Sequence, residues 1–264
     1  MENAPIPPSA PRRPQVLRAH GDERVDDWYW LRERDDPEVI EYLTAENAFT
    51  ETALAHTEPL QKELYAEIVN RVLETDVSAP AHRGAWDYFA RTYEGRQYAA
   101  HGRRPRDAAV DVDETILLDE NELASGHDYF SLGGAALSPD QQLLAYSVDF
   151  TGGELHELRI RDLATGRDLS DQIPDTYYGL AWANDNQTLF YVRPDDAVRP
   201  YQVWRHTLGT PPVDDVLVYE DTDESFFVNV ARTRTGRYIF VSTDSKTSRM
   251  GVQRFAKSAK PLSQ

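Results

Sequence analysis

The spacing of apolar residues changes near residue 86, and the change separates a helical segment from a β segment. Before it, apolar side chains recur every three or four residues, a period typical of amphipathic helices. The first helix is expected to begin after Asp36, a suitable N-cap, with Pro37 in its first turn. Its apolar positions are Tyr42, Ala45, Phe49 and Ala53.

A second helical stretch follows, because Thr57 and Pro59 repeat the start signal. Its apolar residues lie four apart, at Leu60, Leu64, Ile68 and Val72. The sequence ETDVSAP ends it. Residues 28–73 are therefore expected to form a helical layer.

From Trp86 onward the pattern is typical of short strands and tight turns. WDYFARTYEGRQYAAHGRR contains two strand-like runs joined at Glu94 and Gly95, and ETILLDEN supplies a further strand. The same pattern of turn and strand continues to the end of STDSKTS near Ser248. This part of the chain is expected to be β.

Three phrases in this part resemble one another, each with a polar turn before a strand: LSPDQQLLAYSVD, WANDNQTLFYVRPD and ARTRTGRYIFVSTD. In alignment, 45 residues separate Leu144 from Leu189, and 50 separate Leu189 from Ile239. This period is close to the about 40–50 residues of a β-propeller blade, whereas the alternative, a generic β-sandwich, gives no reason for the recurrence. We therefore predict a propeller whose blades begin near Trp86, Leu137, Trp182 and Ala231.

The predicted ring is incomplete, because a closed propeller needs about 4–8 full blades. The predicted fold class is mainly β, a partial β-propeller of about three and a half blades preceded by an α-helical segment. We divide the chain into a Pro-rich arm expected to be disordered (1–15), the helical segment (16–75), the incomplete propeller (76–248) and an atypical tail (249–264).

The charge balance narrows the classes of partner. The 264 residues contain 28 Lys and Arg against 45 Asp and Glu, a formal charge of -17 that repels nucleic acid and anionic lipid. Acidity focused in a cleft would favour a cationic ligand. The chain has no cysteine, which excludes disulfides and thiolate sites. We expect no membrane span and a cytoplasmic protein, because the start MENAPIPPSAPRRP has no apolar run and none follows.

The sequence offers no catalytic residue, metal site or cofactor site. A nucleophile elbow needs G-x-S-x-G, which does not occur; ASGHD at Ser125 and SLGG at Ser131 lack the flanking glycine. The spacing of the histidines matches no metal-binding pattern. They stand at positions 20, 56, 82, 101, 127, 156 and 206. We interpret them as structural or surface residues.

Several short motifs are better explained as ordinary structure. Asp111, Asp113 and Glu114 suggest a calcium loop, but Ile116 stands where an EF-hand needs glycine. Gly133-Gly134 and Gly152-Gly153 lack the residues of a phosphate loop, so we expect blade turns.

Two aspartates and three tryptophans leave a functional alternative open. Asp149 and Asp195 stand near strand ends, where a carboxylate could meet a cationic peptide, although turn aspartates are the better interpretation. The tryptophans are expected in the core, at Trp28, Trp182 and Trp204.

The segments HGDERVDDWYWLRERDDPEVIEYLTAENAFTETALAHTEPLQKELYAEIVNRVLETD and EGRQYAAHGRR resemble the amino-terminal region of the oligopeptidase B branch of the prolyl oligopeptidase family of serine peptidases. The likeness continues through ALSPDQQLLAYSVDFTGGELHELRIRDLATG, RPYQVWRHTLGT and DVLVYEDTDESFFVNVARTRTGRYIFVSTDSKTS, roughly residues 16–248. The resemblance implies a seven-bladed propeller inserted into an α/β-hydrolase domain. The amino-terminal helices would belong to that domain, whose carboxy-terminal part would be missing from this chain.

The same resemblance implies cleavage of short peptides after Arg or Lys, with the propeller selecting substrates by size. Its Ser-Asp-His triad would lie in the missing hydrolase part, so we expect this chain alone to be inactive. The alternative is a non-enzymatic binding module, to which the helices of residues 28–73 would be of no use.

The tail RMGVQRFAKSAKPLSQ departs from the family pattern. A frayed terminus and non-native sequence from a frameshift or truncated gene are both open, and we favour the second.

Overall fold

The computed structural model describes residues 6–109 and 112–255, with side chains described as far as Ser248. It divides into two compact units, Met1–Leu73 and Glu74–Gln264, which are considered separately.

The first unit opens with a β-hairpin that the periodicity did not predict. Strands β1 (Gln15–Ala19) and β2 (Asp22–Asp26) pair antiparallel. They are joined at His20 and Gly21, whose φ angles of 53° and 82° fit a tight hairpin turn. Both strands are short and largely exposed, so they show no apolar alternation that a sequence pattern could detect.

The end of the predicted disordered arm is ordered against the aromatic segment that follows. Trp30 donates from Nε1 to the carbonyl oxygen of Pro11 over 3.0 Å, and the guanidinium of Arg13 lies 4.3 Å from the centre of the Trp30 ring. The prediction of disorder over residues 1–15 is therefore wrong for the part that begins at Pro11. Residues 1–5 of the arm lie outside the described residues.

The two predicted helices are present. The short 3₁₀ helix η1 (Tyr29–Arg32) precedes α1 (Pro37–Leu54), and η2 (Ala55–Thr57) leads into α2 (Glu58–Val69). Asp36 caps α1 as expected, since its carboxylate accepts from the backbone nitrogen of Glu38 over 2.9 Å. In α2, however, the predicted apolar stripe is exposed within this unit, at Leu60, Leu64 and Ile68.

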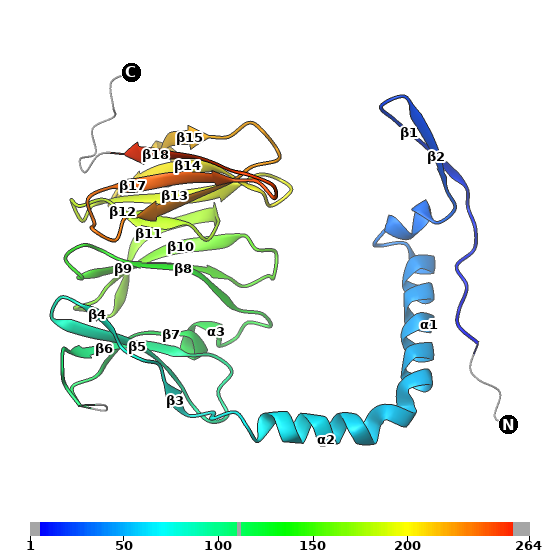
Figure 1. Cartoon of the computed structure of the whole chain (residues 1–264), viewed down its shortest axis with the longest axis horizontal. Coiled ribbons are helices and arrows are strands. Elements are labelled where there is room, and N and C mark those ends of the chain that lie inside the picture. The colour runs from blue at the N-terminus through cyan, green and yellow to red at the C-terminus, as the bar shows by residue number, and fades with distance from the viewer. Residues whose placement is uncertain (1–5, 110–111, 256–264) are drawn as a thin grey trace. The chain divides into compact units, whose positions relative to one another are not determined.

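The second unit consists of antiparallel sheets that follow one another along the chain (Figure 1). The first sheet contains β3 (Asp76–Val77), β4 (Ala81–Arg83), β5 (Trp86–Thr92), β6 (Ala100–Pro105) and β7 (Thr115–Asp119), and is followed by α3 (Glu120–Ala124). The second contains β8 (Ser131–Leu137), β9 (Leu143–Asp149), β10 (His156–Asp162) and β11 (Arg167–Thr176).

The third and fourth sheets continue the same order. The third contains β12 (Leu180–Trp182), β13 (Thr188–Pro194), β14 (Pro200–Thr207) and β15 (Val216–Glu220), with the 3₁₀ helix η3 (Pro212–Asp214) before its last strand. The fourth contains β16 (Phe227–Arg232), β17 (Ile239–Asp244) and β18 (Arg249–Phe255). In the first sheet β3 and β4 both pair with β5; otherwise each strand pairs with the next one in the sequence, which is the meander of a propeller blade.

The sequence repeat lies in the second strand of each of the last three sheets. Leu144, Leu189 and Ile239 fall in β9, β13 and β17. The predicted blade starts at Leu137, Trp182 and Ala231 fall near the carboxyl ends of β8, β12 and β16, so each of these blades begins a few residues earlier than the sequence indicated. The first strands were missed because SLGGAAL in β8 and the three-residue LAW in β12 show no alternation.

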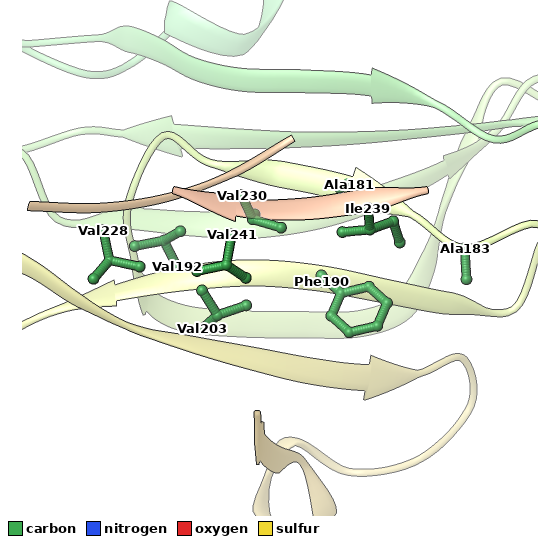
Figure 2. Close-up of a cluster of buried hydrophobic side chains, with 9 residues drawn as sticks. All are labelled: Ala181, Ala183, Phe190, Val192, Val203, Val228, Val230, Ile239 and Val241. Atoms are coloured by element: carbon green, nitrogen blue, oxygen red, sulfur yellow. The ribbon is translucent and has the colours of Figure 1, made fainter. Parts of the chain in front are cut away.

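Each contact between successive sheets is filled by its own apolar cluster. Figure 2 shows the cluster between the third and fourth sheets, formed by Ala181, Ala183, Phe190, Val192, Val203, Val228, Val230, Ile239 and Val241. Leu118 and Tyr146 belong to the cluster between the first and second sheets, and Ile160 and Trp182 to the one between the second and third. Burial of each large apolar side chain contributes roughly 1.5–3 kcal/mol, so the sheets hold one another through these clusters.

The predicted class, mainly β with a partial propeller, is confirmed. The predicted atypical tail differs in part, because its residues 249–255 form β18 and pair antiparallel with β17. Residues 256–264 of that tail lie outside the described residues.

Candidate functional site

A cavity of about 610 Å³ lies where one edge strand from each of the four sheets converges. We call it the four-sheet cavity. Its walls come from β4, β8, β12 and β16 and from the turn after β16. Segments distant in sequence therefore meet only because the sheets are arranged around a common centre.

The four-sheet cavity is cationic, although the chain is strongly acidic. Its lining includes three arginines and one histidine: Arg83, Arg232, Arg234 and His82. Among the described residues, no Asp or Glu lines it. Acidity focused in a cleft, which would favour a cationic ligand, is therefore not found in this cavity. The sign of the charge in this cavity is opposite to that of the whole chain, whose net charge is -17.

Arg232 is the most enclosed of these cations. Its guanidinium donates to the side-chain oxygen of Asn184 and, over 3.3 Å, to the carbonyl oxygen of Gly236. Both acceptors are neutral, and burial lowers the pKa of Arg232. The cavity thus holds a half-buried positive charge that no carboxylate of the described residues neutralises.

His82 lies at the edge of the cavity and is oriented by a buried carboxylate. Its Nδ1 is 2.5 Å from Oδ1 of Asp87, a residue only 3% exposed. The hydrogen bond to His82 is the main cause of a lowered pKa at Asp87. This contact leaves Nε2 as the ring nitrogen of His82 that can meet a ligand.

Asp149 and Asp195 organise turns, as the sequence indicated. Asp149 is 2% exposed and accepts from the backbone nitrogens of Thr151 (2.7 Å) and Glu154 (2.9 Å). Burial opposes its ionisation, but these hydrogen bonds outweigh it and lower the pKa of Asp149. Asp195 accepts a hydrogen bond of 2.9 Å from Nε of Arg199. Burial opposes the ionisation of Asp195 as well, but its hydrogen bonds to Arg199 and Ala197 outweigh this effect and lower its pKa.

The structure places a buried histidine between two carboxylates, which the sequence did not reveal. His206 in β14 is fully buried, with Nδ1 2.7 Å from Asp215 and Nε2 3.0 Å from Asp171 in β11 of the neighbouring sheet. Tyr191 donates to the second oxygen of Asp215 over 2.8 Å. Burial, together with that hydrogen bond, raises the pKa of Tyr191. No sequence motif marks this cluster, because its members come from β11, β13, β14 and the residue just before β15.

His156 has the opposite environment. It is 1% exposed, and neither ring nitrogen has a hydrogen-bond partner among the described residues. Burial lowers the pKa of His156, against the attraction of Asp149 and Glu154. The ring is packed closely, since a Cβ added at Gly133 would lie 2.5 Å from its Cδ2.

The remaining sequence candidates carry no site. Glu114 is used in ion pairs with Arg91 (2.8 Å) and Arg104 (3.1 Å), while Asp113 is exposed and Asp111 lies outside the described residues. Within residues 6–109 and 112–255, no group of three or more His, Asp or Glu could hold a metal ion.

The tryptophan predictions have mixed outcomes. Trp182 is 1% exposed, as expected, and Trp204 packs partly buried against the cluster between the second and third sheets. The prediction is wrong for Trp28, which is 46% exposed. It lies in the turn between β2 and η1, on the surface of the first unit.

The four successive antiparallel sheets define a β-propeller domain, and comparison with known proteins assigns its family. Residues 7–262 match the family model of the prolyl oligopeptidase N-terminal β-propeller domain. The chain belongs to the prolyl oligopeptidase family of serine peptidases.

Two curated relatives and two solved structures illustrate the likeness. Dipeptidyl aminopeptidase BI of Pseudoxanthomonas mexicana is 38% identical over 259 residues, covering 92% of this chain and 36% of the relative. Protease 2 of Moraxella lacunata is 35% identical over 246 residues, covering 91% of this chain and 36% of the relative. Oligopeptidase B from Leishmania major is 25% identical with a TM-score of 0.88, covering 98% of this chain and 39% of that chain. Oligopeptidase B from Trypanosoma brucei is 29% identical with a TM-score of 0.81, covering 94% of this chain and 39% of that chain.

The chain spans little more than a third of the length of these relatives. No helix among the described residues has both the length and the apolar character required to cross a bilayer.

Proposed function

We propose that this chain is the amino-terminal portion of an oligopeptidase B-like serine endopeptidase that cleaves short peptides after Arg or Lys. The observation that carries the proposal is the family match over residues 7–262 together with the TM-score of 0.88 to oligopeptidase B from Leishmania major. In this role the four sheets belong to a propeller that selects substrates by size. Nucleic acid and membranes are not expected partners, and the cytoplasmic location predicted from the sequence is checked by cell fractionation.

We further propose that a hydrolase domain covers the apolar face of α2. Leu60 is 56% exposed, Leu64 47% and Ile68 64% in the first unit. A row of large apolar residues at this spacing is typical of a helix that packs against a partner. The relatives, which are peptidases about three times as long as this chain, offer such a partner in the remainder of their length.

The chain itself is proposed to lack the catalytic triad. No serine hydroxyl is hydrogen-bonded to a histidine ring among the described residues, and the sequence contains no nucleophile elbow. Removal of a triad typically costs about 10⁶ in turnover, so hydrolysis should be undetectable.

The test uses the purified chain and an amino-blocked fluorogenic peptide ending in Arg. A parallel sample is treated with a serine-directed phosphonate. We expect no inhibitor-sensitive turnover. Turnover that is blocked by the phosphonate and co-purifies with the chain would overturn this part of the proposal.

A second candidate is a dipeptidyl aminopeptidase, favoured by the name of the relative that is 38% identical. The two candidates differ in the substrate required by the complete enzyme. An endopeptidase accepts an amino-blocked Arg peptide, whereas a dipeptidyl aminopeptidase requires a free amino terminus two residues before the cleaved bond. Assay of the complete enzyme with the blocked and unblocked substrates distinguishes them.

A further inference from the structure

We propose that the four-sheet cavity binds the carboxylate of a short peptide. The choice of a peptide rests on the proposed function, whereas the choice of an anionic group rests on the cavity alone. Its positive lining is unexpected in a chain of net charge -17, because a random sample of this surface would contain more carboxylates than guanidinium groups.

The cations of the cavity are available to a ligand. Neither Arg83 nor Arg234 forms an ion pair with a carboxylate of the described residues, and both are exposed. Other arginines of this unit are paired, as Arg161 is with Asp168 over 2.8 Å. A guanidinium presents several donors in a fixed plane that matches a carboxylate, so unpaired arginines facing one cavity form a suitable anion site.

Arg232 is held in position for this role. A Cβ added at Gly236 would lie 2.8 Å from Nη2 and 3.2 Å from Cζ of Arg232, so the guanidinium rests directly against a glycine. Gly236 also has a φ of 66°, which favours glycine. The turn thus fixes a half-buried cation whose present acceptors are neutral. A ligand carboxylate would supply the missing negative charge.

The size and the apolar part of the lining suit a short peptide. A volume of about 610 Å³ lies in the range of about 300–1,000 Å³ of small-ligand sites. Leu137, Leu180 and Trp182 contribute apolar wall beside the arginines. The carboxylate would bind the guanidinium groups, and adjacent side chains of the peptide would contact this wall.

The binding experiment uses the purified chain and isothermal titration calorimetry at low salt. The probes are acetyl-tri-alanine with a free carboxylate, the same peptide as its carboxy-terminal amide, and inorganic phosphate. We expect the free acid to bind at least about tenfold more tightly than the amide, because only the free acid offers the guanidinium groups a charged acceptor. Equal binding of acid and amide, or tighter binding of phosphate than of the free acid, would overturn the proposal.

Two variants and a control locate the site. Arg234→Ala removes an exposed cation and is not expected to alter folding, while Arg232→Gln removes the enclosed one. Each should weaken binding of the free acid about tenfold. Arg167→Ala, an exposed arginine at the start of β11, changes the net charge equally and should leave binding unchanged. Loss of binding in the control variant, or unchanged binding in Arg234→Ala, would contradict the proposed site. Because no hydrolysis is measured, this result is independent of the activity assay.

Discussion

The indole nitrogen of Trp182 donates a hydrogen bond of 2.9 Å to the carbonyl oxygen of Ala136. The bond joins β12 to β8, the first strands of neighbouring sheets, beside the four-sheet cavity. Trp182 is 1% exposed and belongs to the cluster between these sheets. One side chain thus fills the interface and satisfies a backbone acceptor across it.

Trp182→Phe should lower the free energy of unfolding by about 1–3 kcal/mol, because the carbonyl of Ala136 loses its donor in a partly buried setting. Urea unfolding followed by circular dichroism measures the change. Trp204→Phe is the matched control, since Trp204 is only partly buried and donates to Gln202 in the same strand over 2.8 Å. An equal effect of both substitutions would show that the bond between sheets is not the cause.

His206→Leu should destabilise the chain more strongly, by about 3–5 kcal/mol, because it leaves Asp171 and Asp215 as buried carboxylates without their partner. His101→Leu is the control: His101 is 38% exposed in its side chain, and its contact with Glu120 should be worth about 0–1 kcal/mol. Chemical unfolding of the two variants gives the comparison. A cost at His206 no larger than at His101 would contradict a stabilising role for the cluster.

His156 should make the chain less stable as the pH falls. Burial lowers its pKa in the folded state, whereas an unfolded histidine titrates near about 6.5. Below that pH the unfolded chain binds the proton more readily, so stability that is complete above about pH 6.5 is lost on acidification, by about 1.4 kcal/mol per pH unit until the folded pKa is reached.

His156→Phe removes this titration without leaving an orphaned partner, because neither ring nitrogen is hydrogen-bonded within the described part of the chain. Urea unfolding between pH 8 and 5 should therefore give a shallower pH dependence for the variant than for the wild type. Asp149 and Glu154, the charged groups that face the ring, remain in both proteins. Identical slopes would rule out His156 as the source.

The elements that the sequence predicts well are those whose apolar period is long or repeated. The two helices and the second strands containing Leu144, Leu189 and Ile239 belong to this class. The short hairpin before Trp28 and the first strands of the second and third sheets do not, because exposed, glycine-rich or very short strands have no alternation to detect.

The charged clusters could not be predicted for a different reason. His206 and Asp171 are 35 residues apart, and the cations of the four-sheet cavity come from two of its sheets, the first and the fourth. Their proximity depends on how the sheets pack, which local sequence does not encode. Family resemblance supplies the fold of the chain, but it does not indicate that the cavity is positively charged.

The apolar face of α2 should make the isolated chain self-associate, since exposed apolar patches beyond a few hundred Å² are uncommon on soluble monomers. The double variant Leu60→Lys and Ile68→Lys should shift size-exclusion profiles toward monomer and reduce binding of a dye for apolar surface. Gln61→Lys with Ala66→Lys adds the same charge at exposed positions of α2 but retains the large apolar residues. If this control is equally effective, charge rather than the apolar face explains the result.

The most direct test of the account is to place this chain in a complete peptidase. In a chimera, it replaces the matching 39% of oligopeptidase B from Leishmania major. Activity is measured on a short Arg peptide and on a folded protein of similar Arg and Lys content. If the chain supplies a size-selecting propeller, the chimera should hydrolyse the short peptide in a phosphonate-sensitive manner and leave the folded protein intact. A folded chimera that cannot hydrolyse the peptide, or that digests the folded protein at a comparable rate, would contradict the proposed role.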